Sequence, residues 1–280
     1  MTTRRTKAEM ETIRDGIYEF AKENQPVTIR QTFYHLVAHG IIPKCEKQYR
    51  MISTQATNMR RDGELPYDWI TDVGRSEIEP LTFKGMAEAL RSVARTYGRN
   101  PWDNQPVYLQ VWVEKAAMQA LFSEITIPLC VPLYVSKGQS SVTFIRNAAE
   151  RIKEQTALGK RSVILCYGDH DLQGIQIPEA TAKGLWNDHG CDCEVLRMAV
   201  NEDQIEELNL PTRDAKDSAK KQGWDKPTVD IDAIPPAILK QMLYTDITDH
   251  IEDADAWNKS FDVEADEREQ LEVFIQGFGA

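Results

Sequence analysis

The stretch VILCYGDHDLQG, Val163 to Gly174, carries the strongest structural signal in the chain. It begins with a mostly apolar, partly β-branched run, which is typical of a strand buried on both faces of a parallel sheet. Polar residues follow, and in an extended backbone the carboxylates of Asp169 and Asp171 point the same way. Ligands of open α/β sheets bind at this carboxyl end of the strands. The stretch therefore predicts an α/β fold with an acidic site, and a helix that begins close to the strand at Gly174.

Two neighbouring carboxylates repel each other unless a cation lies between them, so this pair favours a bound Mg²⁺ ion. The pair also fits a solvated turn, because aspartate is common at helix N-caps. A second strand-like run, Val107 to Val113, ends at Glu114, and a third, Val131 to Val135, lies between the two. Right-handed crossovers between parallel strands bring their carboxyl ends to one edge. We expect Glu114, Asp169 and Asp171 to converge there.

The order of these motifs, VEK and then GDHDLQG after two strand–helix units, resembles the Toprim domain of topoisomerases, primases and some nucleases. The resemblance implies that Glu114, Asp169 and Asp171 hold Mg²⁺, with Mn²⁺ as a possible substitute, for phosphodiester chemistry. It extends more loosely to Gly174.

The composition indicates an intracellular protein. The chain has 280 residues, 41% of them apolar and 28% charged, which is enough for two domains with cores. The sequence has no long apolar run and no signal-peptide pattern, so we expect a cytosolic protein without a membrane anchor. Its five cysteines are scattered, which favours reduced thiols. The spacing of His189, Cys191 and Cys193 argues against a zinc site.

The net charge of −11 is unevenly distributed along the chain. Residues 201–280 hold 8 Lys and Arg against 20 Asp and Glu, whereas residues 1–61 hold 11 against 6. A basic N-terminal surface is compatible with nucleic-acid binding on one face, although such charge runs also occur on ordinary solvated surfaces.

The N-terminal segment has the pattern of a winged helix. Helical periodicity covers residues 8–23; Thr28 with Gln31 forms a capping box for a second helix that ends at Gly40; a third helix covers residues 46–61. Short strands are expected at residues 65–73, after a turn at Gly63. In a CAP-like winged helix the third helix enters the major groove of DNA. The basic residues expected to contact DNA from this helix are Lys47, Arg50, Arg60 and Arg61.

Tyr34 lies on the second of these helices, beside the apolar stripe that Ile29, Phe33, Leu36 and Val37 form. Arg30 precedes it by four residues, so the guanidinium lies on the same face as the phenol. A phenol is a poor nucleophile unless cations stabilise the phenolate and the phosphate that it attacks. Tyr34 is therefore either a nucleophile supported by Arg30 or a residue that only flanks the core.

The two halves in this order, a winged helix with an R-x-x-[FY]-Y element at Arg30–Tyr34 and then Toprim motifs, resemble the A subunit of topoisomerase VI and the meiotic double-strand-break proteins. The likeness covers roughly residues 26–200 and is closest to the free-standing Mini-A type of prokaryotic genomes and mobile elements. It implies a cytoplasmic homodimer that binds double-stranded DNA, and type IIB cleavage in which Tyr34 forms a 5′-phosphotyrosyl link. Lys115 and Lys137 would neutralise phosphate oxygens.

The chain departs from that family in two places. Phe33 replaces the first tyrosine of the usual pair, and there is no Walker A sequence, so strand passage would need a separate ATPase (B-type) subunit. Two other functions stay open: a Toprim nuclease that hydrolyses DNA with metal and water, and a DNA-binding adaptor without catalysis.

We predict a winged-helix domain over residues 1–75, a helical linker over 76–106 and a Toprim domain over 107–280. In the VDIDAIPP segment of the Toprim domain, Asp230 and Asp232 are expected on the solvent-exposed face of an edge strand rather than at a metal ion. The acidic residues 246–272 are expected to form helix that packs or dimerises.

Overall fold

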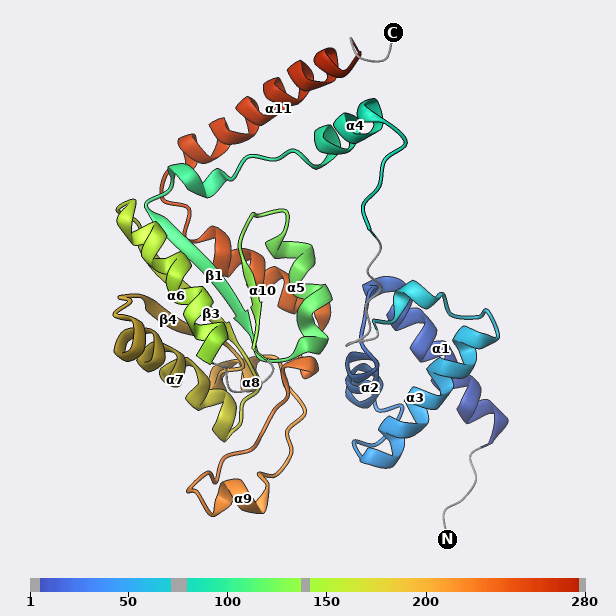
Figure 1. Cartoon of the computed structure of the whole chain (residues 1–280). Helices are drawn as coiled ribbons and strands as arrows, with labels where there is room; N and C mark the ends of the chain where they lie inside the picture. The colour runs from blue at the N-terminus through green and yellow to red at the C-terminus, as the bar shows by residue number, and fades with distance from the viewer. Residues whose placement is uncertain (1–5, 72–79, 137–141, 277–280) are drawn as a thin grey trace.

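The structure, a computed structural model, describes residues 6–71, 80–136 and 142–276 (Figure 1). Three N-terminal helices lie beside a part built on one four-stranded sheet, all of whose strands are parallel. The predicted mixed α/β class with a parallel sheet is confirmed.

The N-terminal helices begin where the sequence predicts. They are α1 (Lys7–Asn24), α2 (Ile29–Ala38) and α3 (Glu46–Arg61). Thr28 and Gln31 cap α2 reciprocally, as the capping box requires: the Gln31 N–H donates to Thr28 Oγ1 at 3.1 Å, and the Thr28 N–H donates to Gln31 Oε1 at 2.8 Å. The fully buried side chains of Ile17, Leu36 and Ile52, one from each helix, lie in the core between them.

The strands expected over residues 65–73 are not present in the described part of that stretch. A 3₁₀ turn, Tyr67–Trp69, follows α3, and the only pairing there is an isolated parallel bridge between Val27 and Ile70. One bridge anchors the segment against the start of α2, since the Val27 N–H donates to the Trp69 carbonyl at 2.9 Å. Residues 72–73 lie outside the described residues.

The sheet has the strand order β2-β1-β3-β4. Its strands are β1 (Val107–Val113), β2 (Leu133–Val135), β3 (Arg161–Tyr167) and β4 (Glu194–Ala199). The chain leaves β1 toward β2 and leaves β3 toward β4, in opposite directions, so the topological switch point lies between β1 and β3. Because Val113 pairs with Tyr167, Glu114 and Gly168 leave the sheet side by side.

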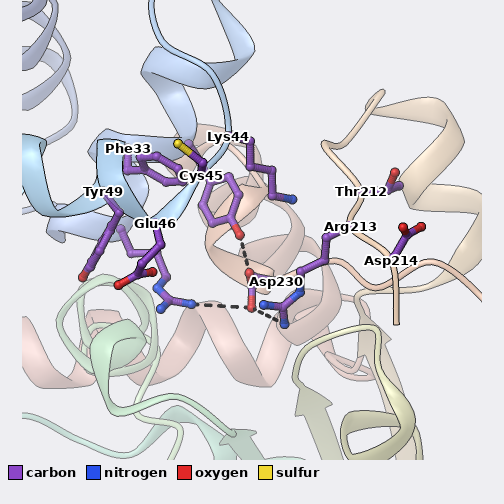
Figure 2. A pocket seen from close by; sticks show the side chains of 11 residues that line it. Phe33, Lys44, Cys45, Glu46, Tyr49, Thr212, Arg213, Asp214 and Asp230 are labelled. Carbon is purple, nitrogen blue, oxygen red and sulfur yellow. Dashed lines mark hydrogen bonds and ion pairs between the residues drawn. The ribbon is translucent and has the colours of Figure 1, made fainter. Parts of the chain in front are cut away.

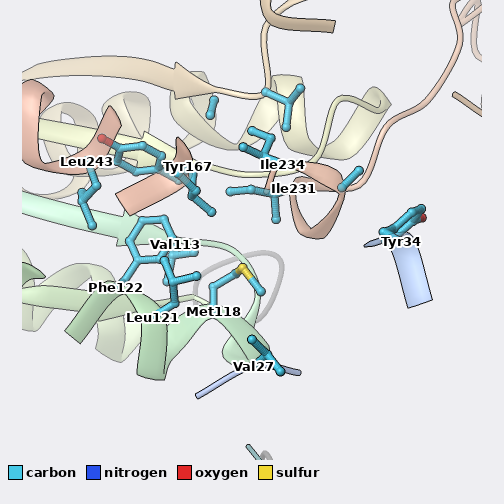
Figure 3. Close-up of a cluster of buried hydrophobic side chains, with 14 of the residues drawn as sticks. Val27, Tyr34, Val113, Met118, Leu121, Phe122, Tyr167, Ile231, Ile234 and Leu243 are labelled. Carbon is cyan, nitrogen blue, oxygen red and sulfur yellow. The ribbon is translucent and has the colours of Figure 1, made fainter. Parts of the chain in front are cut away.

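Alternate side chains of the strands pack against helices on opposite faces of the sheet. The helices are α5 (Gln119–Thr126) and α10 (Pro236–Thr248) on one face, and α6 (Val142–Ala157) and α7 (Leu172–His189) on the other. On the first face Phe122 and Leu243 lie close to Val113 and Tyr167 (Figure 3). Both faces of β1 and β3 are therefore covered, which explains their mostly apolar sequences.

The remaining elements are short or peripheral. They are α4 (Met86–Thr96), the 3₁₀ helices Pro101–Asn104, Ala116–Met118 and Ile231–Ala233, and α8 (Glu202–Glu207), α9 (Asp217–Lys220) and α11 (Ala254–Gln276). Figure 1 shows α4 beside the acidic helix α11, where Arg99 pairs with Glu267 at 2.8 Å. Across the described ranges, no helix is both long and apolar enough to span a bilayer.

Candidate functional site at the acidic edge of the sheet

The three acids predicted from the sequence lie at the same edge of the sheet, and two of them are joined by a hydrogen bond. The Asp169 backbone N–H donates to Glu114 Oε2 at 3.3 Å. Asp171 caps α7, because the Gly174 N–H donates to its Oδ1 at 2.9 Å. Burial raises the pKa of Glu114, and the N–H of Asp169 opposes this. Asp171 therefore acts as a helix N-cap, which is one of the two roles that the sequence allowed for it.

Gly174 allows α7 to begin against the end of β3, as its place in the sequence indicates. A Cβ atom at this position would lie 2.0 Å from the carbonyl oxygen of Asp169. Only glycine fits such a close approach between a helix and the preceding backbone.

A half-buried arginine that the sequence did not single out holds this turn in place. The guanidinium of Arg197, on β4, donates to the carbonyl oxygens of Asp169 at 2.8 Å and Val200 at 2.9 Å. Burial lowers the pKa of Arg197, although Glu114 and the aspartates nearby favour its charge. The chain thus supplies its own cation beside the predicted acid trio.

A second Asp-x-Asp segment lies against the first. The backbone of His170 pairs with Val229 in an antiparallel bridge, and the Ile231 N–H donates to Asp169 Oδ1 at 2.8 Å. This pairing carries Asp230 and Asp232 into the interior, where each is only 2% exposed. The expectation of a solvated edge strand was wrong: the segment is a short bridge followed by a 3₁₀ turn, and its acids are buried against Lys115 and Tyr34.

Lys115 is the counter-ion of these acids. Its Nζ lies 2.9 Å from Asp169 Oδ1, 3.1 Å from Asp230 Oδ1 and 2.8 Å from Asp232 Oδ2. Burial alone would lower the pKa of Lys115, but the three carboxylates together raise it above its usual value. The ammonium is thus already paired inside the protein, and the expected contact of Lys115 with DNA phosphate stays a prediction. We call Lys115, Asp169, Asp230 and Asp232 the acid cluster.

Tyr34 reaches the acid cluster from α2. It is buried, at 5% exposure, and its hydroxyl donates to Asp230 Oδ2. The sequence placed this ring beside the core stripe, whereas the structure includes it in the core at the boundary between the helical part and the sheet part. Burial, together with the hydrogen bond to Asp230, raises the pKa of Tyr34 well above its usual value.

A cavity of about 550 Å³ opens beside this phenol. Three cations line it: Arg30 and Arg213, whose guanidinium nitrogens lie 3.6 and 3.3 Å from Asp230 Oδ1, and Lys44, whose Nζ lies 5.1 Å from the centre of the Tyr34 ring. Figure 2 shows Arg213 linked to Asp230, with Lys44 reaching the cavity from a different part of the chain. Arg30 matches its predicted place beside the phenol. No sequence pattern predicted that Lys44 and Arg213 belong to this site, because only the fold brings their loops together.

The acids do not form a ready metal site. Over residues 6–71, 80–136 and 142–276, no three His, Cys, Asp or Glu side chains are grouped so that they could hold a metal ion. Asp169 Oδ1 contacts Lys115 and the Ile231 N–H, and Asp171 Oδ1 caps α7. The Mg²⁺ site expected at Glu114, Asp169 and Asp171 therefore does not fit the side chains as they stand.

The predicted DNA-contacting residues of α3 are exposed or partly covered. Lys47 and Arg61 are exposed, and Arg50 pairs with Glu46 at 3.2 Å. Arg60 is partly covered and stacks over the Tyr67 ring at 5.8 Å. Lys137 lies outside the described residues.

Comparison of the chain with family models, curated proteins and solved structures finds no match.

Proposed function

We propose that this protein cleaves double-stranded DNA by transesterification, with Tyr34 as the nucleophile. The observation that carries the proposal is the meeting of Tyr34 with Asp230, 196 residues later in the chain, beside a cavity lined by Arg30, Lys44 and Arg213. A tyrosine that only filled the core would need neither an open cavity nor a carboxylate partner that two guanidinium groups also contact.

The reaction exchanges one phosphodiester bond for another. The Tyr34 oxygen forms a bond to phosphorus, the bond from phosphorus to the 3′-oxygen breaks, and the proton of the phenol is transferred overall to the departing 3′-oxygen. The products are a 5′-phosphotyrosyl link and a 3′-hydroxyl, and no ATP is consumed. Arg30, Lys44 and Arg213 carry positive charge that stabilises the charge of the attacked phosphate.

In the described state Tyr34 is a poor nucleophile. Its hydrogen bond to a carboxylate stabilises the neutral phenol, and burial acts in the same direction. Attack therefore requires the hydroxyl to leave Asp230.

The finer organisation belongs to the same proposal. We infer a winged-helix unit over residues 1–75, supported by the order of α1 to α3 and the capping boxes of α1 and α2. We also infer a Toprim unit over residues 107–280, supported by the four parallel strands and the acids at their ends. We further propose a homodimer in a prokaryotic cytoplasm, close to the nucleoid or a mobile element, with a B-type ATPase as a possible partner. Mg²⁺, or Mn²⁺, is proposed as a requirement of the reaction, and no step of the bond exchange is assigned to it.

The test is a cleavage assay on supercoiled plasmid with Mg²⁺ or Mn²⁺, stopped with denaturant and analysed with and without protease. The proposal predicts linear or nicked DNA that enters a gel freely only after protease treatment. Tyr34→Phe should abolish this adduct. Tyr167→Phe, which removes another buried phenol bonded to a carboxylate, should retain it.

Cleavage that needs no protease and survives in Tyr34→Phe would show hydrolysis by a metal-dependent nuclease instead. Binding of DNA without any cleavage under all metal conditions would favour the adaptor.

A further inference from the structure

The acid cluster contains more negative charge than its central cation balances. Asp169, Asp230 and Asp232 are 7%, 2% and 2% exposed, and a single ammonium, that of Lys115, contacts all three. Arg30 and Arg213 come within ion-pair distance of Asp230 from the cavity side, and Asp232 also raises the pKa of Arg30. Carboxylates buried in this way are costly unless cations are paired closely with them.

One oxygen of the cluster has no partner. Asp232 Oδ2 accepts from Lys115, but Asp232 Oδ1 is buried and accepts no hydrogen bond from the described residues. The side chain of Asp232 is fully covered, at 0% exposure. A buried carboxylate oxygen left unpaired is unfavourable in the folded state, and it leaves a hard ligand available inside the cluster.

We propose that Asp169, Asp230 and Asp232 form a site for a hard divalent cation, Mg²⁺ or Mn²⁺, which Lys115 occupies with its ammonium when the ion is absent. Carboxylate oxygens are the preferred ligands of such ions. The ion replaces one positive charge by two among three negative charges, and the unpaired oxygen of Asp232 gains a partner. This arrangement also explains why no three-acid site is preformed: the ammonium stands in the position that the ion needs.

The exchange is sterically feasible because the Lys115 side chain is 19% exposed and lies at the edge of the sheet. On release, its ammonium can move toward solvent or toward a phosphate in the neighbouring cavity. The ion site rests on the proposed function for its role in DNA cleavage, but ion binding is measured on the protein alone, without DNA.

This site differs from the trio expected at the ends of β1 and β3. It shares Asp169, but it takes Asp230 and Asp232, the two other carboxylates that pair with Lys115, in place of Glu114 and Asp171. The difference can be measured, because isosteric amide variants remove one carboxylate charge from either set.

The experiment is a titration of the metal-free, full-length protein with Mn²⁺, followed by electron paramagnetic resonance and by thermal unfolding. The wild type should bind Mn²⁺, and Asp232→Asn should weaken binding by roughly tenfold or more, because one of three coordinating charges is lost. Asp171→Asn and Glu114→Gln should bind as the wild type does. Lys115→Met should bind Mn²⁺ about tenfold more tightly, since the competing ammonium is gone, and Mn²⁺ should raise its unfolding temperature more than that of the wild type.

Three outcomes would overturn the proposal. The first is an affinity for Mn²⁺ that is unchanged in both Lys115→Met and Asp232→Asn. The second is loss of binding in Asp171→Asn or Glu114→Gln alone, which would place the ion at Glu114, Asp169 and Asp171 instead; the third is the absence of Mn²⁺ binding in both the wild type and Lys115→Met. If Lys115→Met folds only in the presence of Mn²⁺, the result supports the site. If Lys115→Met does not fold either with or without Mn²⁺, the proposal is tested by comparing the Mn²⁺ affinities of Asp232→Asn and Asp171→Asn, both of which keep Lys115. If Mn²⁺ binds as expected but no covalent adduct of Tyr34 with DNA forms, the proposed function is refuted and the ion site remains supported.

Discussion

Two Asp-x-Asp segments meet at the carboxyl edge of the sheet, and they are built differently. The first, Asp169 to Asp171, follows a buried strand, and Asp171 serves as a helix cap at the surface. The second, Asp230 to Asp232, follows a loop, and both its acids are buried against Lys115, with Asp230 also bonded to Tyr34. The segment with the more recognisable sequence therefore has the more exposed acid. What an acid contributes is decided by its burial and its partners, and not by the spacing of the motif.

The largest expected effect comes from Asp230→Ala, which tests the second segment. The change leaves the Tyr34 hydroxyl without its acceptor and reduces the negative charge around Lys115, Arg30 and Arg213. Breaking a buried ion-pair network from one side costs about 3–5 kcal/mol. Denaturant unfolding followed by circular dichroism measures the loss. If Asp230→Ala lowered the free energy of unfolding by less than Asp171→Ala does, the second segment would not be the one that contributes more to stability.

Gly174→Ala tests how tightly the first segment is built. The new Cβ would lie 2.0 Å from the Asp169 carbonyl oxygen, so α7 or the turn must move, at a cost of roughly 3 kcal/mol. Gly184→Ala in the same helix is the matched control, because its nearest neighbour would be a side-chain carbon of Ile145 at 3.7 Å. That variant should be neutral or slightly stabilising, by up to about 1 kcal/mol. Equal melting temperatures for the two variants would contradict the close approach.

The acid that both segments share gives a pH dependence. Burial raises the pKa of Asp169 from its usual 3.8 to about 6, against the opposing effect of Lys115. The folded state then binds more protons than the unfolded state between these values, so the free energy of unfolding should fall as the pH rises from 3.8 to about 6. The expected loss is on the order of 1–3 kcal/mol.

Asp169→Asn should flatten that slope in unfolding curves measured above pH 4. Asp230 does not interfere in this range. Although burial alone would raise its pKa, Lys115 and Tyr34 hold the pKa of Asp230 below the usual value, so its contribution is lost only at lower pH. A slope that is the same in the variant would assign the titration to another group.

The smallest effect is expected for Asp171→Ala. The substitution removes the acceptor for the Gly174 N–H at the start of α7, and a lost N-cap costs about 1 kcal/mol. Asp171→Asn keeps an acceptor and should cost only a few tenths. Thermal unfolding of the pair measures the difference, and a loss comparable with that of Asp230→Ala would mean that Asp171 has partners beyond the cap.

Local patterns in the sequence determined much of the fold. The apolar runs of β1 and β3 are long enough to predict buried parallel strands, the Thr28–Gln31 box predicts the start of α2, and Gly174 marks the start of α7. These predictions hold because each depends on the side-chain periodicity, capping or steric demands of residues only a few positions apart. The expected hairpin after Gly63 was wrong in its described part, since one bridge to Val27 took the place of a strand pair.

Only the tertiary structure decided which charges meet. The contacts of Lys115 with Asp230 and Asp232 join residues 115 and 117 positions apart, and Tyr34 meets Asp230 across 196 positions. No periodicity in the sequence links residues so far apart. Their contacts depend on the bridge between His170 and Val229, and on the packing of α2 against the 3₁₀ turn Ile231–Ala233 that follows this bridge. The sequence by itself therefore determined the strands, the caps and the acids that end β1 and β3, whereas the fold decided which acids are buried and that a lysine neutralises them.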